Sequence, residues 1–452
     1  MNRFIDIPGN GLGAHIVSQL VTSGFCHNFN FNHVYKPMPS IHHVPKDNTT
    51  KQYNKRVESM FGFDKLNKYN ESDCEIQYTQ ELYTNKYYIN SSDKLKSLYN
   101  PINKTSYEWV IHIRRNDVSQ NQNKDRFISI EKYSEIIDKI QCFYKGSIHI
   151  YTDGTAEDLK ELTQEHLIII CKSDPLETFA IMSHAKNLVI GYSSFSYSAA
   201  VYNKNHVYCD LIQEGYFHPV LDHWRTIKPH CKIDIGMSKE GIQPATWFRQ
   251  EPNLFVYGFE PHPNNLKRLY ACDCYVSDKR SLVPEMHNRL EIIPMALANV
   301  LEKTTMDFHI PNLDDGCSSL LKAHPDNKMY NGVKDVIKVQ VISLDMFFKT
   351  FDFEKFPYID YIKLDAQGLD LDIVKSGIET IKNRVVWITM EPDGGYYDES
   401  AIEPQNRCIR ENLIRYMNDN DFVLFNHPNT SDPTFYNRKF SDIKDDIFIF
   451  QH

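Results

Sequence analysis

The sequence predicts an α/β protein of two domains, each built around a parallel sheet. With 452 residues the chain is too long for one ordinary hydrophobic core. Apolar strand-like runs alternate with helix-like runs in both halves, and this alternation is typical of parallel sheets. The segment 232–241 restarts the pattern in mid-chain, because an apolar strand ends at Asp234 and is followed by Gly236, Gly241 and a helix signal.

The composition is that of a globular protein, with 41% hydrophobic and 24% charged residues. A net charge of −9 argues against a surface that coats nucleic acid. No apolar run reaches the length of a membrane span, and the N-terminus lacks the apolar core of a signal peptide. The cysteines are scattered without the spacing of a metal clip, so we expect reduced thiols, no zinc clip and a cytoplasmic protein.

The first half opens with a predicted strand at 4–7, followed by Gly9, Gly11 and Gly13 and an apolar helix at 16–21. These glycines are also compatible with a flexible turn. Residues 41–107 are rich in Asn and Lys and predict short helices and loops. Later elements alternate regularly: strands at 107–113, 147–151, 167–171 and 187–190, and helices at 156–162, 177–184 and after Ser196.

Two positions at predicted strand ends suit an anionic ligand. Arg114 and Arg115 directly follow a buried strand, and the carboxyl edge of a parallel sheet is where ligands bind. A solvated ion pair with Asp117 is the alternative. Ser193 and Ser194 lie between a strand and a helix, where hydroxyl and amide donors can meet a phosphate. An ordinary serine N-cap is the alternative there.

These segments resemble the GDP-fucose-dependent fucosyltransferases. The family's H-x-R-R-x-D motif is matched by His112, Arg114, Arg115 and Asp117, a later strand-end acid by Asp153, and its S-S-F-S motif by residues 193–196. The resemblance implies a GT-B-like domain at 1–221 that takes GDP-fucose as nucleotide-sugar donor and a glycan as acceptor. The departures are Asn116, the pair Ala14-His15 in the N-terminal glycine motif, and a short first half.

The resemblance also implies roles for individual residues. Arg115 would hold the β-phosphate and stabilise the departing diphosphate, while His112, Arg114, Asp153, Ser193, Ser194 and Phe195 would line the nucleotide site. An acceptor hydroxyl needs a base, and His15 or His112 has the right unperturbed pKa. Packing or ordinary hydrogen bonding is the alternative for either histidine.

The second half continues the strand–helix alternation beyond a short connector at 216–230. Strands are expected at 254–259, 290–294, 306–310, 336–343, 358–365, 385–390, 422–425 and 447–450. A helix should follow from Leu369, with Ile373, Val374 and Ile378 on its apolar face. Glu260 and Asp365 both stand at strand ends, where an acid can meet a ligand.

This half resembles the FkbM family of S-adenosylmethionine-dependent O-methyltransferases. The matches are Asp234-Ile235-Gly236 with Gly241, the F-E-P-x-P segment at 259–263, and the I-D-x-I-K-x-D segment at 359–365 that runs on to Asp370. Met237-Ser238, Gln367 and Asp370 depart from the usual residues. The resemblance implies a Rossmann-like methyltransferase domain at 222–452.

By this resemblance, Asp234, Gly236, Ser238 and Gly241 would bind the methionine end of S-adenosylmethionine, Glu260 the ribose, and Asn299 the adenine. A sugar hydroxyl is a poor nucleophile and needs a base or a metal. Asp365 is the expected base or metal ligand, with Glu391 second, and a helix N-cap is the alternative for Asp365. No metal ligand set is assigned, although a divalent metal is compatible with this site. Asp370 and Asp372 are expected to be first-turn charges that favour the helix dipole.

The sequence therefore predicts a bifunctional glycan-biosynthesis enzyme that transfers fucose and O-methylates a sugar hydroxyl. The alternative is a sugar O-methyltransferase whose N-terminal domain binds a glycan or nucleotide without catalysis. Ala14, Asn116 and the short first half favour this alternative slightly.

Overall fold

The computed structural model of the chain describes residues 2–4, 12–28, 32–35, 50–68, 74–76, 86–101, 103–212, 218–272, 281–312, 315–324, 332–425 and 431–447. The chain forms two compact units, one made of Met1–Lys139 with Gly146–Ile227 and the other of Ile140–Lys145 with Lys228–His452. The expected functional division into 1–221 and 222–452 stays a prediction. Among the described residues, no helix has both the length and the apolar character that a membrane crossing requires.

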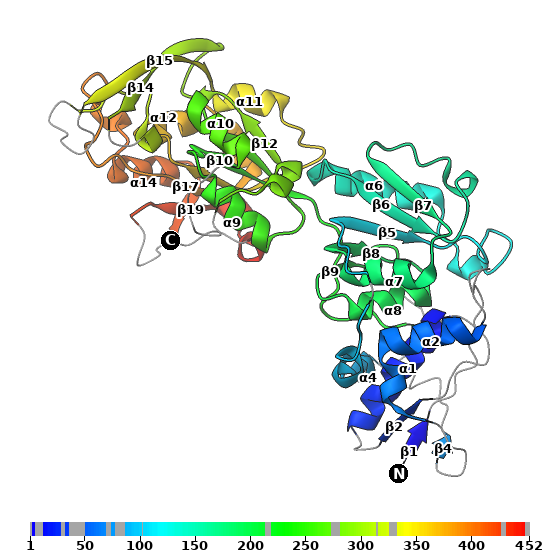
Figure 1. Ribbon diagram of the computed structural model, residues 1–452. Helices are drawn as coiled ribbons and strands as arrows, with labels where there is room; N and C mark the ends of the chain where they lie inside the picture. The colour runs from blue at the N-terminus through cyan, green and yellow to red at the C-terminus, as the bar shows by residue number, and fades with distance from the viewer. Residues whose placement is uncertain are drawn as a thin grey trace. The chain divides into compact units, whose positions relative to one another are not determined.

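The first unit contains two parallel sheets (Figure 1). The smaller has the order β3-β2-β1-β4 and the larger the order β7-β6-β5-β8-β9, with every neighbouring pair parallel. The strands are β1 (Asn2–Phe4), β2 (Asn32–Tyr35), β3 (Asn67–Lys68), β4 (Cys74–Ile76), β5 (Trp109–Ile113), β6 (Ile148–Thr152), β7 (Leu167–Cys171), β8 (Asn187–Val189) and β9 (His206–Tyr208). The helices are α1 (Leu12–Asn28), α2 (Thr50–Phe61), α4 (Lys86–Asn90), α5 (Asp93–Lys96), α6 (Ile130–Phe143), α7 (Pro175–His184) and α8 (Ser194–Tyr202).

The larger sheet follows the predicted strands closely. All five residues of β5 are buried, as a central strand covered on both faces requires. The helix expected at 156–162 is wrong, since only a 3-10 turn forms at Glu157–Leu159. That stretch has just Leu159 and Leu162 to bury, and Asp158 instead bonds the backbone and hydroxyl of Thr155. The small sheet was not predicted, because its strands are short and polar.

The glycine-rich start of the chain has a packing role at Gly13. This residue lies in α1, which packs on α8, and a Cβ there would lie 2.3 Å from the Phe195 backbone nitrogen. The flexible-turn alternative is therefore wrong for Gly13, because the residue lets two helices approach closely. Gly9, Gly11 and residues 5–7 of the first predicted strand lie outside the described residues.

The second unit is built on a seven-stranded sheet of order β12-β11-β10-β16-β17-β19-β18. Its first five strands are parallel, and β19 runs antiparallel to both of its neighbours. The strands are β10 (His230–Ile235), β11 (Leu254–Phe259), β12 (Leu290–Ile293), β16 (Ile359–Leu364), β17 (Val385–Thr389), β18 (Phe422–Phe425) and β19 (Thr434–Asn437). A separate sheet of order β13-β15-β14 contains β13 (Ala296–Leu297), β14 (Thr304–Pro311) and β15 (Val333–Ile342).

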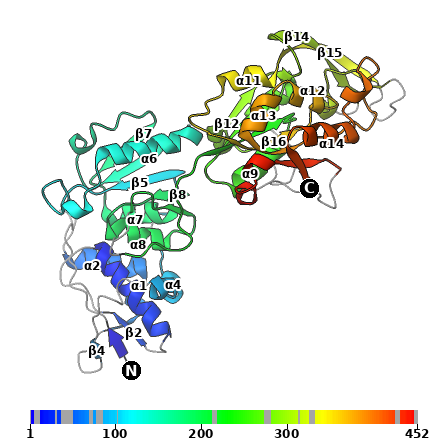
Figure 2. The ribbon, with the colours of Figure 1, turned by 180° about the vertical axis from the view of Figure 1, so that it is seen from behind.

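Helices cover both faces of the seven-stranded sheet. Figure 1 shows α9 and α10 in front of the strands, and Figure 2, from the opposite side, shows α13 in front. The helices are α9 (Ile242–Gln250), α10 (Pro263–Ala271), α11 (Leu344–Thr350), α12 (Asp370–Lys375), α13 (Ile378–Arg384) and α14 (Arg410–Asp419). Trp247, Leu269 and Trp387 belong to one buried cluster, so side chains from α9, α10 and β17 share a core.

Two expectations in this unit need correction. The single helix expected after Leu369 is broken into α12 and α13 at Gly377. A Cβ added at this position would lie 2.7 Å from Leu344 Cβ. The antiparallel strand β19 was not predicted. Of the strand expected at 447–450, Ile447 lies outside any strand and the rest lies outside the described residues.

In both large sheets the first strand in the chain lies at the centre, and later strands are added first on one side of it and then on the other. From β10 the chain proceeds outward through β11 and β12, and it later returns to the other side through β16 and β17. From β5 it proceeds through β6 and β7 and returns through β8 and β9. Such a switch point opens a crevice at the carboxyl ends of the two central strands, where ligands bind in this class of fold.

Candidate functional site

A cleft lies at the switch point of the second unit, beyond the carboxyl ends of β10, β11 and β16. It contains about 600 Å³ of space, part of which is open to solvent. Polar and apolar groups both line it: Ile235, Gly236, Ser238, Phe259, Glu260, Pro261, Asn265, Met295, Ala296, Leu297, Phe308, Gly316, Ser318, Leu320, Asp365, Ala366, Gln367 and Leu369.

Gly236 makes the close approach of β10 and β16 possible. Its φ is +85°, and a Cβ there would lie 2.1 Å from the Asp365 carbonyl oxygen. Its backbone N–H donates to Phe259 O at 3.0 Å, which holds the turn against β11. Gly241, with φ +57°, precedes α9, and the turn between the two glycines places Ser238 in the cleft lining. A larger residue at Gly236 would push the two strand ends apart.

Asp234 lies in β10, two residues before this glycine, and is buried. Its Oδ1 has no hydrogen-bond partner among the residues that the structure describes. Burial raises the pKa of Asp234 to about 7, with Asp365 and Glu260 adding to the rise and Lys363 opposing it. Asp234 does not line the cleft itself, but the two residues that follow it, Ile235 and Gly236, do.

Glu260 lines the cleft and is held in place by backbone and side-chain donors. Its Oε1 accepts a hydrogen bond from the His262 backbone at 2.8 Å and one from Asn265 Nδ2 at 3.3 Å. Burial raises the pKa of Glu260 to about 7. Asn265 Oδ1 is buried and has no partner among the described residues. Sequence reasoning missed Asn265, although its place in the first turn after the F-E-P-x-P segment is a usable signal.

The rest of the lining is largely apolar. Phe259, Met295, Leu297 and Phe308 come from three different strands or their ends and make a surface that suits a flat base. Asn299, which was expected to contact adenine, does not line this cleft. Its backbone N–H instead donates to Asp372 Oδ2 at 2.9 Å.

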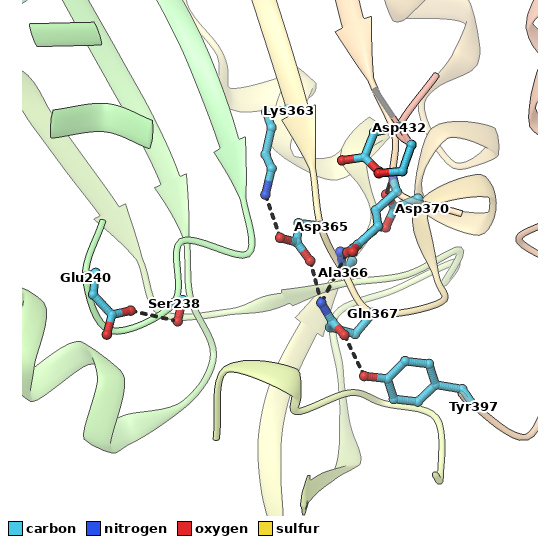
Figure 3. A network of polar contacts seen from close by, with 11 residues as sticks. Ser238, Glu240, Lys363, Asp365, Ala366, Gln367, Asp370, Tyr397 and Asp432 are labelled. Atoms are coloured by element: carbon cyan, nitrogen blue, oxygen red, sulfur yellow. Dashed lines mark hydrogen bonds and ion pairs between the residues drawn. The ribbon is translucent and has the colours of Figure 1, made fainter. Parts of the chain in front are cut away.

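Asp365 belongs to a network of polar contacts that Figure 3 shows. Lys363 Nζ donates to its Oδ2 at 2.7 Å, and Gln367 Nε2 donates to its Oδ1 at 2.5 Å. The same Gln367 amide nitrogen donates to Glu391 Oε2 at 3.2 Å, and the Tyr397 hydroxyl donates to Gln367 Oε1 at 2.6 Å. Gln367 and Tyr397 were not predicted, because their importance depends on which strand ends meet.

The two carboxyls of this network hold opposite protonation states. The Lys363 ammonium, with hydrogen bonds from Gln367 and Glu391, lowers the pKa of Asp365 despite its burial. Burial and the adjacent Asp365 raise the pKa of Glu391. At neutral pH Asp365 is therefore the ionised partner and Glu391 the protonated one.

Asp370 lies in the first turn of α12, as expected, but it is not simply a charge that favours the helix dipole. Its side chain is buried, and it accepts the Ala366 backbone N–H at 2.8 Å and the Glu391 backbone N–H at 2.7 Å. Burial raises the pKa of Asp370 to about 7. It therefore ties the turn after β16 to the end of β17 and fixes the positions of Asp365 and Glu391.

A divalent metal does not fit Asp365 as the residues stand. Each of its carboxylate oxygens already accepts a hydrogen bond, one from Lys363 and one from Gln367, and the nearby Lys363 ammonium repels a cation. No chemical step is therefore derived through a metal here. The N-cap alternative for Asp365 is also wrong, because α12 begins at Asp370 and its cap residue is Leu369.

In the first unit, the predicted residues gather at the corresponding edge of the larger sheet. His112 lies in β5, Arg115 and Asp153 follow β5 and β6, and Ser193 precedes α8. Asp153 Oδ1 accepts the Arg115 backbone N–H at 2.6 Å and the Asn116 N–H at 3.2 Å. The acid therefore orders the turn that carries both arginines.

The two arginines differ in their contacts. Arg114 forms an ion pair with Asp117, as the alternative reading of this motif expected. Arg115 instead donates from Nη1 to Arg114 O and from Nη2 to Ile128 O, both at 2.9 Å. Its guanidinium stacks over Phe127, with 4.9 Å to the ring centroid. Arg115 is thus held in a fixed position by the protein backbone.

The predicted histidine and serine residues differ in their burial and in their partners. His112 is buried, burial lowers its pKa to about 4, and its Nδ1 has no partner among the described residues. The Ser194 hydroxyl lies 2.8 Å from His218 Nε2. Ser193 is the N-cap residue of α8, as the alternative expected, although its side chain makes no capping hydrogen bond. Phe195 packs at 5.6 Å from His112. His15 packs edge-on against Tyr35 and Phe63.

Comparison with known proteins bears on the second unit. Residues 234–434 match the family model described as the methyltransferase FkbM domain. The comparisons with curated proteins and with solved structures found no match. The matched segment begins at Asp234 and contains every residue that lines the cleft. The C-terminal part of the chain is therefore similar to FkbM methyltransferase domains, which supports an S-adenosylmethionine-dependent methyltransferase.

Proposed function

We propose that the chain is an S-adenosylmethionine-dependent O-methyltransferase that acts on a sugar hydroxyl, and that its N-terminal unit binds a nucleotide sugar or glycan. The main supporting observation is that Glu260 and Asp365 line one cleft at the switch point of the second unit. That cleft lies within the segment that matches the FkbM family model.

The residues of the cleft fit the cofactor. Glu260 and the unsatisfied Asn265 Oδ1 offer acceptors to the ribose hydroxyls, and the apolar surface of Phe259, Leu297 and Phe308 suits the adenine. Asp234, with its unsatisfied buried oxygen behind Gly236, favours a positive group at the methionine end. When bound, S-adenosylmethionine supplies an electrophilic methyl group on a sulfonium.

Asp365 has the position and charge to receive the acceptor hydroxyl. It lines the cleft, and its side chain is 32% exposed, so an incoming hydroxyl can reach it. Because its pKa is lowered, the carboxylate is a weak base that orients the hydroxyl and takes its proton late, as the new O–C bond forms.

Glu391, Gln367 and Tyr397 keep this carboxylate in place. Gln367 bridges the two carboxyls, and Tyr397 fixes the Gln367 amide so that its NH₂ group faces both acids. Because Glu391 is protonated, the pair of Asp365 and Glu391 carries a single negative charge, which Lys363 partly offsets. The network therefore orients Asp365 without adding a second charge that would repel it.

The test separates cofactor binding from methyl transfer. The full-length protein is incubated with S-adenosylmethionine carrying a labelled methyl group and with a set of oligosaccharides. Label should enter a sugar hydroxyl. Glu260→Gln should weaken cofactor binding, whereas Asp365→Asn should bind the cofactor and fail to transfer. Absence of cofactor binding by the wild type would contradict the proposal.

A second candidate function is fucosyl transfer from GDP-fucose at the first unit. The observation that favours it is the fixed guanidinium of Arg115, which follows β5 at the carboxyl edge of the sheet, where Asp153 also follows β6. A fixed cation at that edge suits a departing diphosphate. His112 can act only as a neutral base, since its pKa is lowered.

Calorimetry with GDP-fucose and GDP-mannose distinguishes these roles. Saturable GDP-fucose binding with consumption of the donor would support transfer, and binding without consumption would support a binding unit. If the Arg115→Ala variant loses both binding and consumption of GDP-fucose, both belong to the sheet edge that carries Arg115. If neither nucleotide binds, the first unit has a different ligand.

A further inference from the structure

A cluster of potential metal ligands lies at the amino ends of β10 and β16, at the end of these strands opposite the cofactor cleft. His230 opens β10, Asp360 is the second residue of β16, and Glu251 directly follows α9. One ligand atom of each residue lies within 4.8 Å of those of the other two. The proposed methyl transfer does not use these three side chains, although Asp360 is the first acid of the I-D-x-I-K-x-D segment.

The geometry of the cluster is compact. His230 Nδ1 lies 2.6 Å from Asp360 Oδ2 and 3.7 Å from Glu251 Oε2. Zinc binds histidine nitrogen and carboxylate oxygen at about 2.0–2.2 Å, so ligands on one ion stand roughly 3–4 Å apart. Small side-chain rotations would bring the three atoms to that spacing. His230, with 21% of its side chain exposed, gives the cluster access to solvent.

The charges leave room for a cation. Lys232 Nζ lies 2.5 Å from Glu251 Oε1 and opposes a cation there, but two carboxylates outnumber this one ammonium, and the other oxygen, Glu251 Oε2, lies 3.7 Å from His230 Nδ1. Asp360 is only 4% exposed, and its Oδ1 has no hydrogen-bond partner among the residues that the structure describes. A buried carboxylate oxygen without a partner is costly, and a bound cation is one of the few ways to satisfy it.

We propose that His230, Glu251 and Asp360 bind a divalent zinc-type cation that cross-links β10, β16 and the end of α9. One imidazole and two carboxylates form a mixed N/O set that suits zinc better than magnesium. In the metal-bound form, neutral His230 gives its Nδ1 lone pair to the ion instead of donating a proton to Asp360. The ion would act structurally, because this edge of the sheet is remote along the strands from Asp365.

The test uses full-length protein that has been stripped with a chelator and dialysed. Zinc titrated into it by calorimetry should bind with one equivalent at this site. His230→Gln and Glu251→Gln should each weaken the affinity at least tenfold. The matched controls His309→Gln and Glu291→Gln, which change the same residue types elsewhere in the unit, should change it less than twofold. Zinc should also raise the unfolding temperature of the wild type and of the two controls, but not that of the His230 and Glu251 variants.

Two results would overturn the proposal. One is the absence of saturable zinc binding, and the other is equal binding by all four variants. If the His230 or Glu251 variant fails to fold, cobalt loaded into the wild type decides the matter. A spectrum of nitrogen and oxygen ligands supports the site, whereas a sulfur-to-cobalt charge-transfer band would assign the ion to the free cysteines and overturn it.

Discussion

The two units offer opposite charges at the same place in the same kind of sheet. The sheets β7-β6-β5-β8-β9 and β12-β11-β10-β16-β17 have the same order of parallel strands along the chain. At the switch point, Glu260 and Asp365 line the cleft of the second unit beside Lys363, whereas the first unit has Arg115 and Arg114 beside Asp153 and Asp117. The fold thus determines where a ligand binds, and the residues at the strand ends determine its charge. An acidic edge suits a sulfonium cofactor, and a basic edge suits a diphosphate.

The strongest test of the acidic edge is Asp365→Asn. An amide keeps the shape but cannot take the proton of the acceptor hydroxyl, so methyl transfer should fall by roughly 10²–10⁴-fold. Cofactor affinity should change only a few-fold, because Glu260 and the apolar lining remain. Single-turnover transfer and calorimetry measure the two quantities separately. Turnover at the wild-type rate would remove Asp365 from the chemistry.

The basic edge is tested by Arg115→Ala. Removing the fixed guanidinium should weaken GDP-fucose binding by about tenfold or more, since a charge-assisted bond to phosphate contributes roughly 1.5–3 kcal/mol. Arg114→Ala is the matched control and should have a smaller effect, because Arg114 is paired with Asp117. Binding of S-adenosylmethionine should be unchanged in both. Equal losses in the two variants would contradict the special role of Arg115.

Gly13→Ala tests whether the first unit depends on close helix packing. A Cβ would lie 2.3 Å from Phe195 N, so helices α1 and α8 must separate, at a cost of about 1–3 kcal/mol. Thermal unfolding followed by calorimetry should show that the variant's first unit is less stable than that of the wild type. The exposed His27→Ala, on the same helix, serves as control. If Gly13→Ala were as stable as the wild type, the close approach of α1 to α8 would not be needed.

The smallest expected effect is a pH dependence of cofactor binding. The pKa of Glu260 is raised to about 7, so the side chain is neutral at pH 6 and ionised at pH 8. The ionised form accepts ribose hydroxyls and attracts the sulfonium, so the dissociation constant should fall several-fold as the pH rises from about 6 to 8. Asp234 shifts in the same direction. Glu260→Gln should flatten the profile, and an unchanged profile would exclude Glu260 as its source.

Much of the second unit could be predicted from local patterns. The predicted limits of β11 and β18 agree with the structure, because each is a short apolar run bounded by polar or proline residues. Glu260, Asp365 and Glu391 were expected at strand ends and are found there. By contrast, β19 and the small N-terminal sheet were not predicted, since short polar strands have no apolar pattern of their own.

The sequence by itself determined which residues stand at the ends of the strands, because strand and turn signals are local and the carboxyl ends of parallel strands share one edge. Only the tertiary structure decided how those residues meet. It buried Asp370 between two backbone donors, placed Gln367 between Asp365 and Glu391, and gave the cleft Asn265 rather than Asn299. The physical reason is that protonation state, hydrogen bonding and burial depend on neighbours far apart in the chain.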